Sequence, residues 1–442
     1  MKKIIAFILI AAICLSLSSC NLDFAFGKYD YTDHTVATAA PKATVSLLES
    51  RQEGYLEFLD KIDRFAAKLT YEVYLDKNGS DNLAISPISV YMALALATEC
   101  ADGETRQQIL DAVGVSYDEI SKYTKYLYSL SNQTFYAGRK GSEVSSLALL
   151  SNSIWADNGV KLKDAGVNNL ANNYNCDLYT VDFGSGEANK AINSFVKDKT
   201  YGVIDGGIDL SPETLITLIN TFYLKEIWNV DGDELSFTNE SYAFVNIDGT
   251  TKDTKLLKGY YSNGRVYDGE GYTSFYTTTE HNYQIKFIVP KDGYTLNDVF
   301  TTQNIYDINN VENYGYVDDE NMLLHHTRVF FPEYEASFDN DISNILREGF
   351  GIENLFDSFG CDFSNITDEP VCCDGVIHKC KLEVNKKGIE GAAVTYIPMN
   401  GTSAGPGKYE NVYHDYIVDR AFGYVITDNS GAVLFSGVVN GI

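Results

Sequence analysis

The sequence is poor in the residues that nucleic-acid binding, metal binding and membrane crossing require. It has 34 Lys and Arg against 61 Asp and Glu, which gives a formal net charge of −27. Because nucleic-acid phosphates are bound by clustered Lys and Arg, we expect no nucleic-acid partner. The six histidines (34, 281, 325, 326, 378 and 414) show no metal-ligand spacing, and no phosphate-binding or dinucleotide-binding glycine motif occurs, so no metal and no cofactor are expected. The hydrophobic fraction of 45% still allows a sizeable folded core.

The first twenty residues have the pattern of an export signal. Lys2 and Lys3 precede the apolar run of residues 4–17, which is short for a membrane span. This segment ends in Leu17-Ser-Ser-Cys20, which resembles a bacterial lipobox, in which the cysteine is lipidated and becomes the first mature residue. We therefore expect an exported chain that a lipid on Cys20 anchors at the cell surface, and the alternative is an ordinary signal peptide and a secreted protein. No later apolar run is long enough to span a bilayer, so this lipid is the only membrane contact that we expect.

Six cysteines follow the leader, namely Cys100, Cys176, Cys361, Cys372, Cys373 and Cys380. Export permits disulfides, but this number in a chain of 442 residues is far from a disulfide scaffold. A bond between Cys361 and either Cys372 or Cys373 is one option, and the spacing does not decide it. The cysteines around His378 lack the Cys-x-x-Cys spacing of zinc sites and alternate as in a strand, so we favour a strand over a metal site.

The rest of the chain divides into a tether and one large domain. Residues 21–53 are rich in Ala, Thr and Ser without sustained periodicity, which predicts a flexible tether. Helical spacing over 55–69 and 90–98, the latter opened by Ser86-Pro87, is followed by strand-like runs at 215–228, 283–289 and 376–384. A helix is predicted over 342–350 and a β-hairpin over 423–435. Helices and strands without strict alternation indicate an α+β domain over residues 54–442.

One segment near the end has no convincing secondary-structure pattern. After the strand-like run, residues 386–407 are mostly small or polar and include Asn400-Gly-Thr-Ser-Ala-Gly-Pro-Gly407. Long loops without structure are uncommon inside compact domains and are often functional. A plain surface loop is the alternative that composition alone leaves open.

This segment contains Gly401-Thr-Ser-Ala-Gly405, which matches the G-x-S-x-G nucleophile elbow of α/β-hydrolases. The elbow needs a helix directly after its serine, and Pro406-Gly407 prevents one. The nearby base candidates His414 and Asp415 are too close in sequence to lie on later strand ends. We therefore expect no catalysis by Ser403 and no enzymatic activity.

Several motifs follow one another in order from about residue 55 to the end of the chain. The most specific are Asn82-Leu-Ala-Ile-Ser-Pro-Ile-Ser89 and Asn220-Thr-Phe-Tyr-Leu-Lys-Glu-Ile-Trp228. Shorter matches are Gly103-Glu-Thr105, Asn152-Ser-Ile-Trp155, Ile192-Asn193, Thr200-Tyr-Gly202, Phe331-Pro332, His378-Lys379, Phe422 and Gly437. Together they resemble the serpin family over nearly the whole domain.

The resemblance implies a serpin-like α+β fold of three β-sheets with surrounding helices and an exposed reactive-centre loop. It implies that the chain inhibits a serine-type endopeptidase as a suicide substrate. The protease cuts the loop and forms an acyl-enzyme, and the cut loop then inserts as a new strand of the central sheet and traps the protease. The resemblance places six residues where this sheet opens: Ser86, Ser89, Asn220, Lys225, Trp228 and His378.

The same resemblance assigns roles within the loop. The hinge is Lys387, Gly388, Ile389, Glu390, Gly391, Ala392, Ala393, Val394 and Thr395. Counting the family's usual distance from this hinge places the reactive bond at Thr402–Ser403, within one residue. The small, uncharged Thr402 suits a shallow apolar pocket, so the expected target is an elastase-like or subtilisin-like protease. We expect the inhibitor to be a monomer.

The side-chain pattern of the loop fits insertion into a sheet, where faces alternate with a period of two. Uncharged residues would face the core, namely Ile389, Gly391, Ala393, Thr395, Ile397 and Met399, whereas Glu390 would face outward. Three features argue against insertion: the bulk of Ile389, the flexibility of Gly391, and Pro398, which donates no ladder hydrogen bond. The alternative is therefore a non-inhibitory serpin-fold binding protein whose loop is cleaved without trapping.

Overall fold

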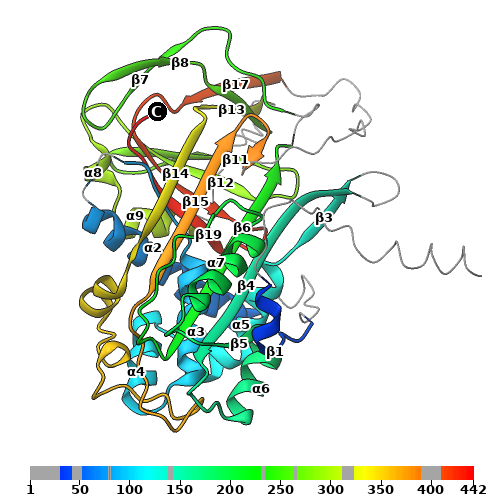
Figure 1. The fold of residues 1–442 in the computed structure, drawn as a ribbon. Helices are drawn as coiled ribbons and strands as arrows, with labels where there is room; N and C mark the ends of the chain where they lie inside the picture. Colours follow the sequence, from blue (N-terminus) through cyan, green and yellow to red (C-terminus); the bar gives the residue numbers. More distant parts are fainter. Residues whose placement is uncertain are drawn as a thin grey trace, which may run out of the picture.

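A computed structural model of the chain describes residues 30–41, 52–77, 79, 81–137, 143–229, 234–262, 266–310, 323–389 and 410–442. The helical elements are η1 (Tyr31–His34), α2 (Glu53–Lys77), α3 (Pro87–Cys100), α4 (Gly103–Val113), α5 (Tyr117–Leu130), α6 (Asp164–Asn173), α7 (Glu187–Lys199), α8 (Leu296–Val299), α9 (Thr302–Asn310), η3 (Ile345–Gly349) and η4 (Asn354–Phe356). Figure 1 shows most of these helices behind and below the sheets.

The strands form one long sheet that bends into two parts. The large sheet has the order β1 (Thr35–Ala37), β5 (Cys176–Val181), β4 (Glu143–Asp157), β6 (Ile216–Ile227), β16 (Gly388–Ile389), β15 (Ile377–Asn385) and β14 (Tyr334–Asp341), and β3 (Thr134–Ala137) pairs with β4. The second sheet has the order β2 (Leu83–Ile85), β19 (Val433–Val439), β18 (Phe422–Thr427), β12 (Gln284–Pro290), β11 (Tyr272–Thr278) and β10 (Val266–Asp268). A single residue pair, Ser337 with Leu83, joins the two parts.

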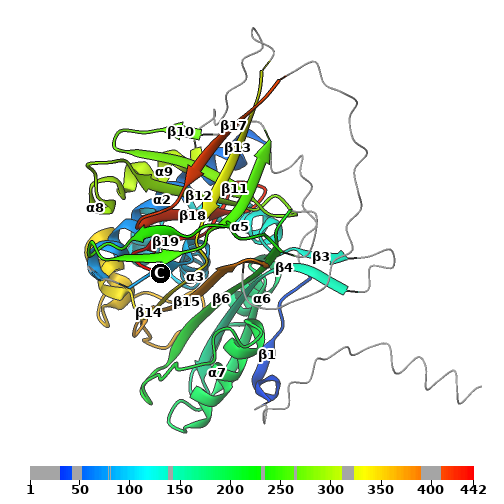
Figure 2. The same cartoon turned by 90° about the horizontal axis from the view of Figure 1, so that it is seen from above.

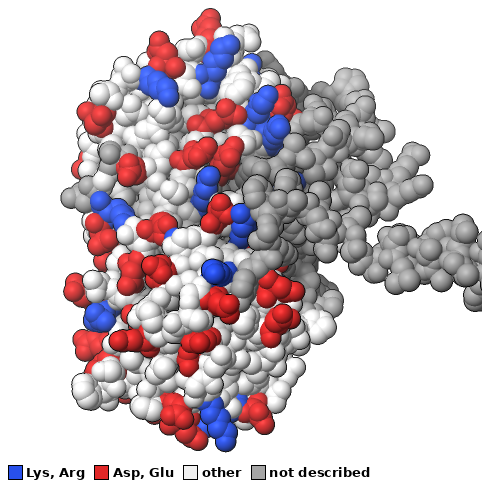
Figure 3. Space-filling view, viewed as in Figure 1, with Lys and Arg blue, Asp and Glu red and all other residues white. Residues whose placement is uncertain are grey.

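Two smaller sheets complete the fold. One has the order β17 (Glu410–Ile417), β13 (Leu323–Phe331) and β9 (Leu257–Ser262), and the other pairs β7 (Tyr242–Val245) with β8 (Thr251–Thr254). The predicted α+β fold with three main sheets and surrounding helices is confirmed. Asp and Glu are spread over the visible face with Lys and Arg between them (Figure 3), in keeping with the net charge of −27.

The burial of apolar side chains explains the helices α2 and α3. The buried residues of α2 recur at three- and four-residue spacing, as in Tyr55, Phe58, Leu59 and Ile62, so one face of this helix packs on the core. In α3 nearly every side chain is buried, because the helix lies inside the molecule. It begins at Pro87, whose missing N–H costs nothing at a helix start. Both predicted helices are confirmed.

Strand β6 lies at the centre of the large sheet, with helices over both faces. Figures 1 and 2 show α7 across one face and α3 on the other, and both helices contact β6. Coverage on both sides explains the nearly continuous apolar sequence of this strand, which the sequence predicted to be buried.

The helix predicted over 342–350 is confirmed over residues 343–350, and its middle is the π-helical turn η3. One expectation needs correction. Residues 30–41 do not belong to a free tether, because η1 and β1 pack on the folded domain. The chain offers no helix with the length and apolarity of a membrane span within the described ranges.

Candidate functional site

The chain turns back on itself between β15 and β16 and enters the large sheet. Asn385 pairs with Gly388 across this turn, and the Asn385 side-chain oxygen accepts a hydrogen bond from the Lys387 N–H at 2.8 Å. Such a side-chain-to-backbone bond two residues on is the usual way in which Asn closes a turn. The predicted hinge of the loop therefore starts at a turn that the Asn385 side chain fixes.

The two residues of β16 form a wedge between β6 and β15. Gly388 pairs with Ile227 and Ile389 with Glu226 on one side, while β15 supplies the partners on the other side. In the described part of the chain this wedge is the whole connection between β6 and β15, because β6 otherwise pairs with β4 and β15 with β14. Among the described residues, β6 and β15 therefore form no backbone ladder directly with each other.

Only glycine fits at position 388. A Cβ atom on Gly388 would lie 1.9 Å from the carbonyl oxygen of Glu226, far inside the van der Waals distance. Ile389, by contrast, is 1% exposed and packs in the core. The bulk that we expected to hinder insertion at Ile389 therefore does not keep this side chain out of the sheet, and Gly388 is the position with no spare room.

Contacts from three directions hold the turn in place. Trp228 donates its indole N–H to the Asn385 carbonyl at 2.8 Å. The Lys386 N–H donates to the Glu333 carboxylate at 2.8 Å, and the Lys386 carbonyl accepts from the Leu235 N–H at 2.7 Å. Of the residues predicted to lie where the sheet opens, Trp228 thus contacts the turn that leads into the loop, at Asn385.

A buried carboxylate next to the wedge was not predicted from the sequence. Glu226 is 1% exposed and accepts hydrogen bonds from the Ser146 hydroxyl at 2.8 Å and from its neighbour Ile227 N–H at 3.0 Å. The same oxygen lies 2.9 Å from Nδ1 of His281, whose ring stacks on Phe135 at 3.8 Å. A charged residue inside the apolar run of 215–228 was the available signal, but its partners come from distant segments.

Farther down the sheet, three of the predicted residues meet. His378 on β15 accepts a hydrogen bond from the Ser86 N–H at 3.1 Å through Nε2, and the Ser86 hydroxyl donates to Ser89 at 3.2 Å. All three are buried, and burial lowers the pKa of His378 to about 4. The imidazole is therefore neutral at physiological pH, which leaves Nε2 free to accept.

The other two predicted residues of this region lie on β6. Asn220 donates its side-chain N–H to the Asn152 side chain and to the Ser151 carbonyl, and its own Oδ1 is buried without a hydrogen-bond partner in the described chain. Lys225 is half-buried near the end of β6 and pairs with Leu147 of β4. No contact joins Asn220 to His378 among the described residues, although both lie along the facing edges.

Several predicted positions fall outside the described residues. They are Cys20 and, in the loop, Glu390, Gly391, Ala392, Ala393, Val394, Thr395, Thr402 and Ser403. The six cysteines after the leader are all described, and all are free thiols. Within the same described ranges, no group of three or more His, Cys, Asp or Glu side chains is arranged to hold a metal ion.

A central sheet in which a loop enters between two strands that do not pair with each other in the described chain defines a class of proteins in which a loop can add a strand. Residues 60–441 match the family model described as Serpin (serine protease inhibitor), and the chain belongs to this family. It is 24% identical to putative serpin-Z6C of Oryza sativa subsp. japonica, with 85% of this chain and 94% of that protein covered. It is 25% identical to alpha-1-antiproteinase S of Cavia porcellus, with 84% and 87% covered.

Solved structures agree on the fold. The thermophilic serpin tengpin in its native state superposes with a TM-score of 0.70 at 22% identity, covering 92% of this chain and 98% of tengpin. Thyroxine-binding globulin in complex with thyroxine superposes with a TM-score of 0.68 at 21% identity, covering 87% and 99%. At this identity the likeness concerns the fold alone, so the two neighbours leave open whether this chain inhibits or binds.

The tight fit of Gly388 gives a first prediction. Gly388→Ala should push the wedge out of the sheet and lower the free energy of unfolding by about 1–3 kcal/mol, the usual cost of overpacking. Because Trp228 is bonded to the turn, its fluorescence should shift to the red, and limited proteolysis should cut the turn faster. Gly186→Ala is the matched control, since a Cβ there meets nothing within 4 Å. Identical behaviour of the two variants would contradict the wedge.

The buried His378 gives a second prediction, on pH. Its pKa of about 4 in the folded protein is below the ordinary 6.5, so the unfolded chain takes up a proton first as the pH falls. The stabilisation is complete above pH 6.5 and is lost as the pH falls toward 4, which amounts to about 2 kcal/mol between pH 7 and pH 4.5. Urea unfolding at both pH values should show a smaller acid-induced loss for His378→Gln, which keeps an acceptor. An equal loss in both proteins would exclude His378 as the source.

Proposed function

We propose that this serpin inhibits serine proteases as a suicide substrate. The observation that carries the proposal is the wedge of Gly388 and Ile389 between β6 and β15, two strands that do not pair with each other in the described chain. A strand that enters this position gains hydrogen bonds on both sides. If about ten further residues insert, at roughly 0.5–1.5 kcal/mol net per hydrogen bond, the gain is on the order of 5–15 kcal/mol.

The wedge supplies the register of the inserted strand. Because Gly388 pairs with Ile227 and Ile389 with Glu226, each further loop residue moves one position back along β6. Continued in this way, the register reaches Ile216, the first residue of β6, at Met399. The length of β6 therefore matches an insert that ends at Met399, three residues before Thr402.

The same register supports the expected alternation of faces. Gly391 would lie opposite Leu224 and Leu382, which are both buried. Glu390 would lie opposite Lys225 and Glu383, which are both half-buried on the outer face. This register allows a charged side chain at position 390 and excludes one at position 391. The sequence agrees, with Glu390 and Gly391 at these positions.

One inserted residue would satisfy a polar group that now lacks a partner. In this register Thr395 lies opposite Asn220 on β6 and His378 on β15, on the core face. The buried Oδ1 of Asn220 has no hydrogen-bond partner in the described chain. An unsatisfied buried acceptor costs about 1–3 kcal/mol. A hydrogen bond from the Thr395 hydroxyl to this Oδ1 would remove that cost.

The trapping reaction follows from acyl transfer. The protease serine oxygen attacks the Thr402 carbonyl carbon, the Thr402–Ser403 bond breaks, and the Ser403 amine leaves with a proton. Water would normally hydrolyse the resulting ester. Insertion up to Met399 carries the attached protease along the sheet first and distorts its catalytic groups. The small Thr402 side chain favours elastase-like or subtilisin-like targets, and this chain itself performs no catalysis.

The setting of this inhibitor is part of the proposal. The leader favours export, with a lipid on Cys20 holding a monomeric inhibitor at a bacterial cell surface. Because residues 30–41 pack on the domain, the free tether would extend only over residues 21–29. At about 3.3–3.6 Å per extended residue, the domain would remain within roughly 30 Å of the membrane.

A second candidate is a serpin-fold binding protein whose loop is cleaved without trapping. The observation in its favour is Pro398, which would lie inside the inserted strand and donates no ladder hydrogen bond. In the register above, Pro398 would pair with Thr217 near the start of β6, where the inserted strand ends and one missing bond matters least. We therefore place inhibition first.

Incubation with purified proteases tests the proposal directly. An elastase-type serine protease should form a covalent complex with the full chain that survives boiling in detergent. A trypsin-type protease should form much less of it, because its pocket requires Arg or Lys. Mass spectrometry of the released peptide should place the cut within one residue of Thr402–Ser403. Complete cleavage there with no covalent complex would favour the binding-protein alternative.

A pair of neighbouring substitutions tests the register. Gly391→Arg should convert the inhibitor into a substrate, because it places an unpaired charge between Leu224 and Leu382 in the core. Glu390→Arg is the matched control, because it adds the same side chain one residue earlier on the outer face. The ratio of cleaved chain to covalent complex should rise at least about tenfold for Gly391→Arg and change little for the control. Equal effects of the two substitutions would refute the predicted faces.

A further inference from the structure

A short segment before the first long helix is docked on the edge of the large sheet. Strand β1 pairs antiparallel with β5 through Thr35 with Tyr179 and Ala37 with Leu178. The segment continues to residue 41, and residues 42–52 separate it from α2. It is thus an extended peptide added to an exposed sheet edge, which is a common mode of peptide recognition.

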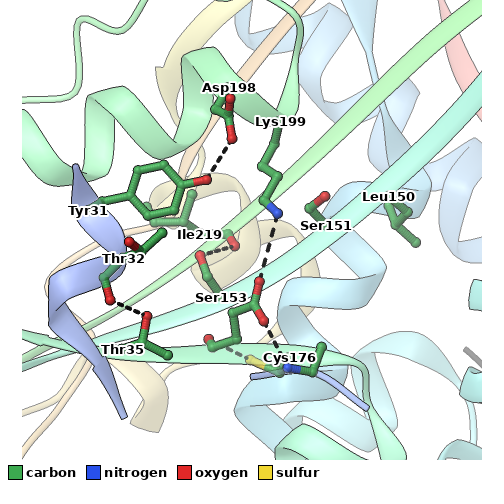
Figure 4. Close-up of polar contacts among 12 residues, drawn as sticks. Tyr31, Thr32, Thr35, Leu150, Ser151, Ser153, Cys176, Asp198, Lys199 and Ile219 are labelled. Carbon is green, nitrogen blue, oxygen red and sulfur yellow. Dashed lines mark hydrogen bonds and ion pairs between the residues drawn. The ribbon is translucent and has the colours of Figure 1, made fainter. Parts of the chain in front are cut away.

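Tyr31 anchors this segment under α7. Its ring is 6% exposed and lies edge-on to Trp155, Tyr179 and Phe195, with centroid distances of 6.5, 5.9 and 5.5 Å. Its hydroxyl donates a 2.7 Å hydrogen bond to Asp198 of α7, as Figure 4 shows. An aromatic ring in an apolar pocket with its hydroxyl bonded at the far end is a specific anchor.

Polar contacts fix the other end of the segment. The Ala39 N–H donates to Asp177 at 2.8 Å, and the Ala40 carbonyl accepts from the Asn175 side chain at 2.7 Å. Asp177 also faces Lys199 of α7 at 3.9 Å, so one carboxylate contacts both the segment and the end of that helix. The Ala40 N–H donates to Ala171 of α6 at 2.9 Å. The segment therefore joins β5, α6 and α7.

From these contacts we infer that the β5 edge and the pocket under α7 form a docking groove for an extended tyrosine-containing peptide. Its occupant is the chain's own segment 30–41, which acts as a separable latch. Two β-pairs, one buried ring and the hydrogen bonds of Tyr31, Ala39 and Ala40 hold it, while Val36 in its middle is 47% exposed. Strand β1 is the outermost strand on its side of the sheet, so no other described strand is held in the sheet by pairing with it.

The latch has a consequence for loop insertion, and this part rests on the proposed function. Helix α7 contacts β6 and lies across it (Figure 1), where the second half of the inserted strand would arrive. Tyr31 and Asp177 hold the last turn of α7 through Asp198 and Lys199. An occupied groove therefore resists the movement of α7 that insertion requires, and an empty groove eases it.

Binding in trans tests the groove without any protease. A fluorescein-labelled peptide of residues 29–41 is titrated against the full chain carrying Tyr31→Ala, whose own latch has lost its anchor. Saturable binding is expected, at least about tenfold tighter than to the wild-type chain, whose groove is occupied, because one anchor ring exceeds 1.4 kcal/mol. The same peptide with Ala for Tyr31 should not bind. Absence of binding, or equal binding to both chains, overturns the docking groove.

A second measurement tests the effect on insertion. The loop is cut with a metalloprotease, and the tryptophan signal is followed as the cut loop inserts. Tyr31→Ala should insert several-fold faster than the wild type, whereas Val36→Ala, an exposed position in the same segment, should not. Equal rates overturn the link to α7 and leave the peptide result as it stands. Absence of insertion in every chain, with peptide binding intact, contradicts the proposed inhibitor and not the groove.

Discussion

The entry of Gly388 and Ile389 between β6 and β15 is the feature on which the rest of this structure depends. In the described chain β6 and β15 share only the two-residue wedge of Gly388 and Ile389. The wedge lies where it does because glycine alone fits beside the Glu226 carbonyl. This single close contact sets the starting point of any inserted strand, and the starting point sets the register and the facing of every residue that follows.

Packed layers on both faces of β6 limit what can enter. On the core face, Ser86, Ser89 and the neutral His378 form a buried polar cluster beside α3. On the other face lies α7, which the segment at Tyr31 ties to the sheet edge. A strand that enters between these layers loses water on both sides, so an unpaired charge on its core face would be costly. The core-facing positions of the loop carry no charge, which agrees with this cost.

The sequence predicted the features that depend on local pattern. The spacing of apolar residues indicated α2 and α3, and the apolar run indicated β6. The motifs at Asn82 and Asn220, together with their order along the chain, indicated the fold and the region where the central sheet opens. The meeting of Ser86, Ser89 and His378 was implied by the family resemblance rather than by their spacing, since almost three hundred positions separate them.

Other features depend on contacts that no local pattern carries. Residues 30–41 resemble a tether in composition, and their order comes from one tyrosine that enters a pocket made by three distant aromatic rings. In the sequence, Glu226 interrupts an apolar strand. Only the folded structure shows its partners, His281 and Ser146, which come from distant segments. The bulk of Ile389 looked like an obstacle because the sequence does not show how much space a partly opened sheet provides.

The central claim is that the cut loop completes the large sheet, and its most direct test is heat. The full chain is nicked near Thr402 with a metalloprotease, which forms no acyl-enzyme, and its melting temperature is compared with that of the intact chain. A gain on the order of 5–15 kcal/mol in a domain of this size predicts a rise of at least about 10–20 °C. An unchanged or lower melting temperature after complete nicking would contradict insertion between β6 and β15.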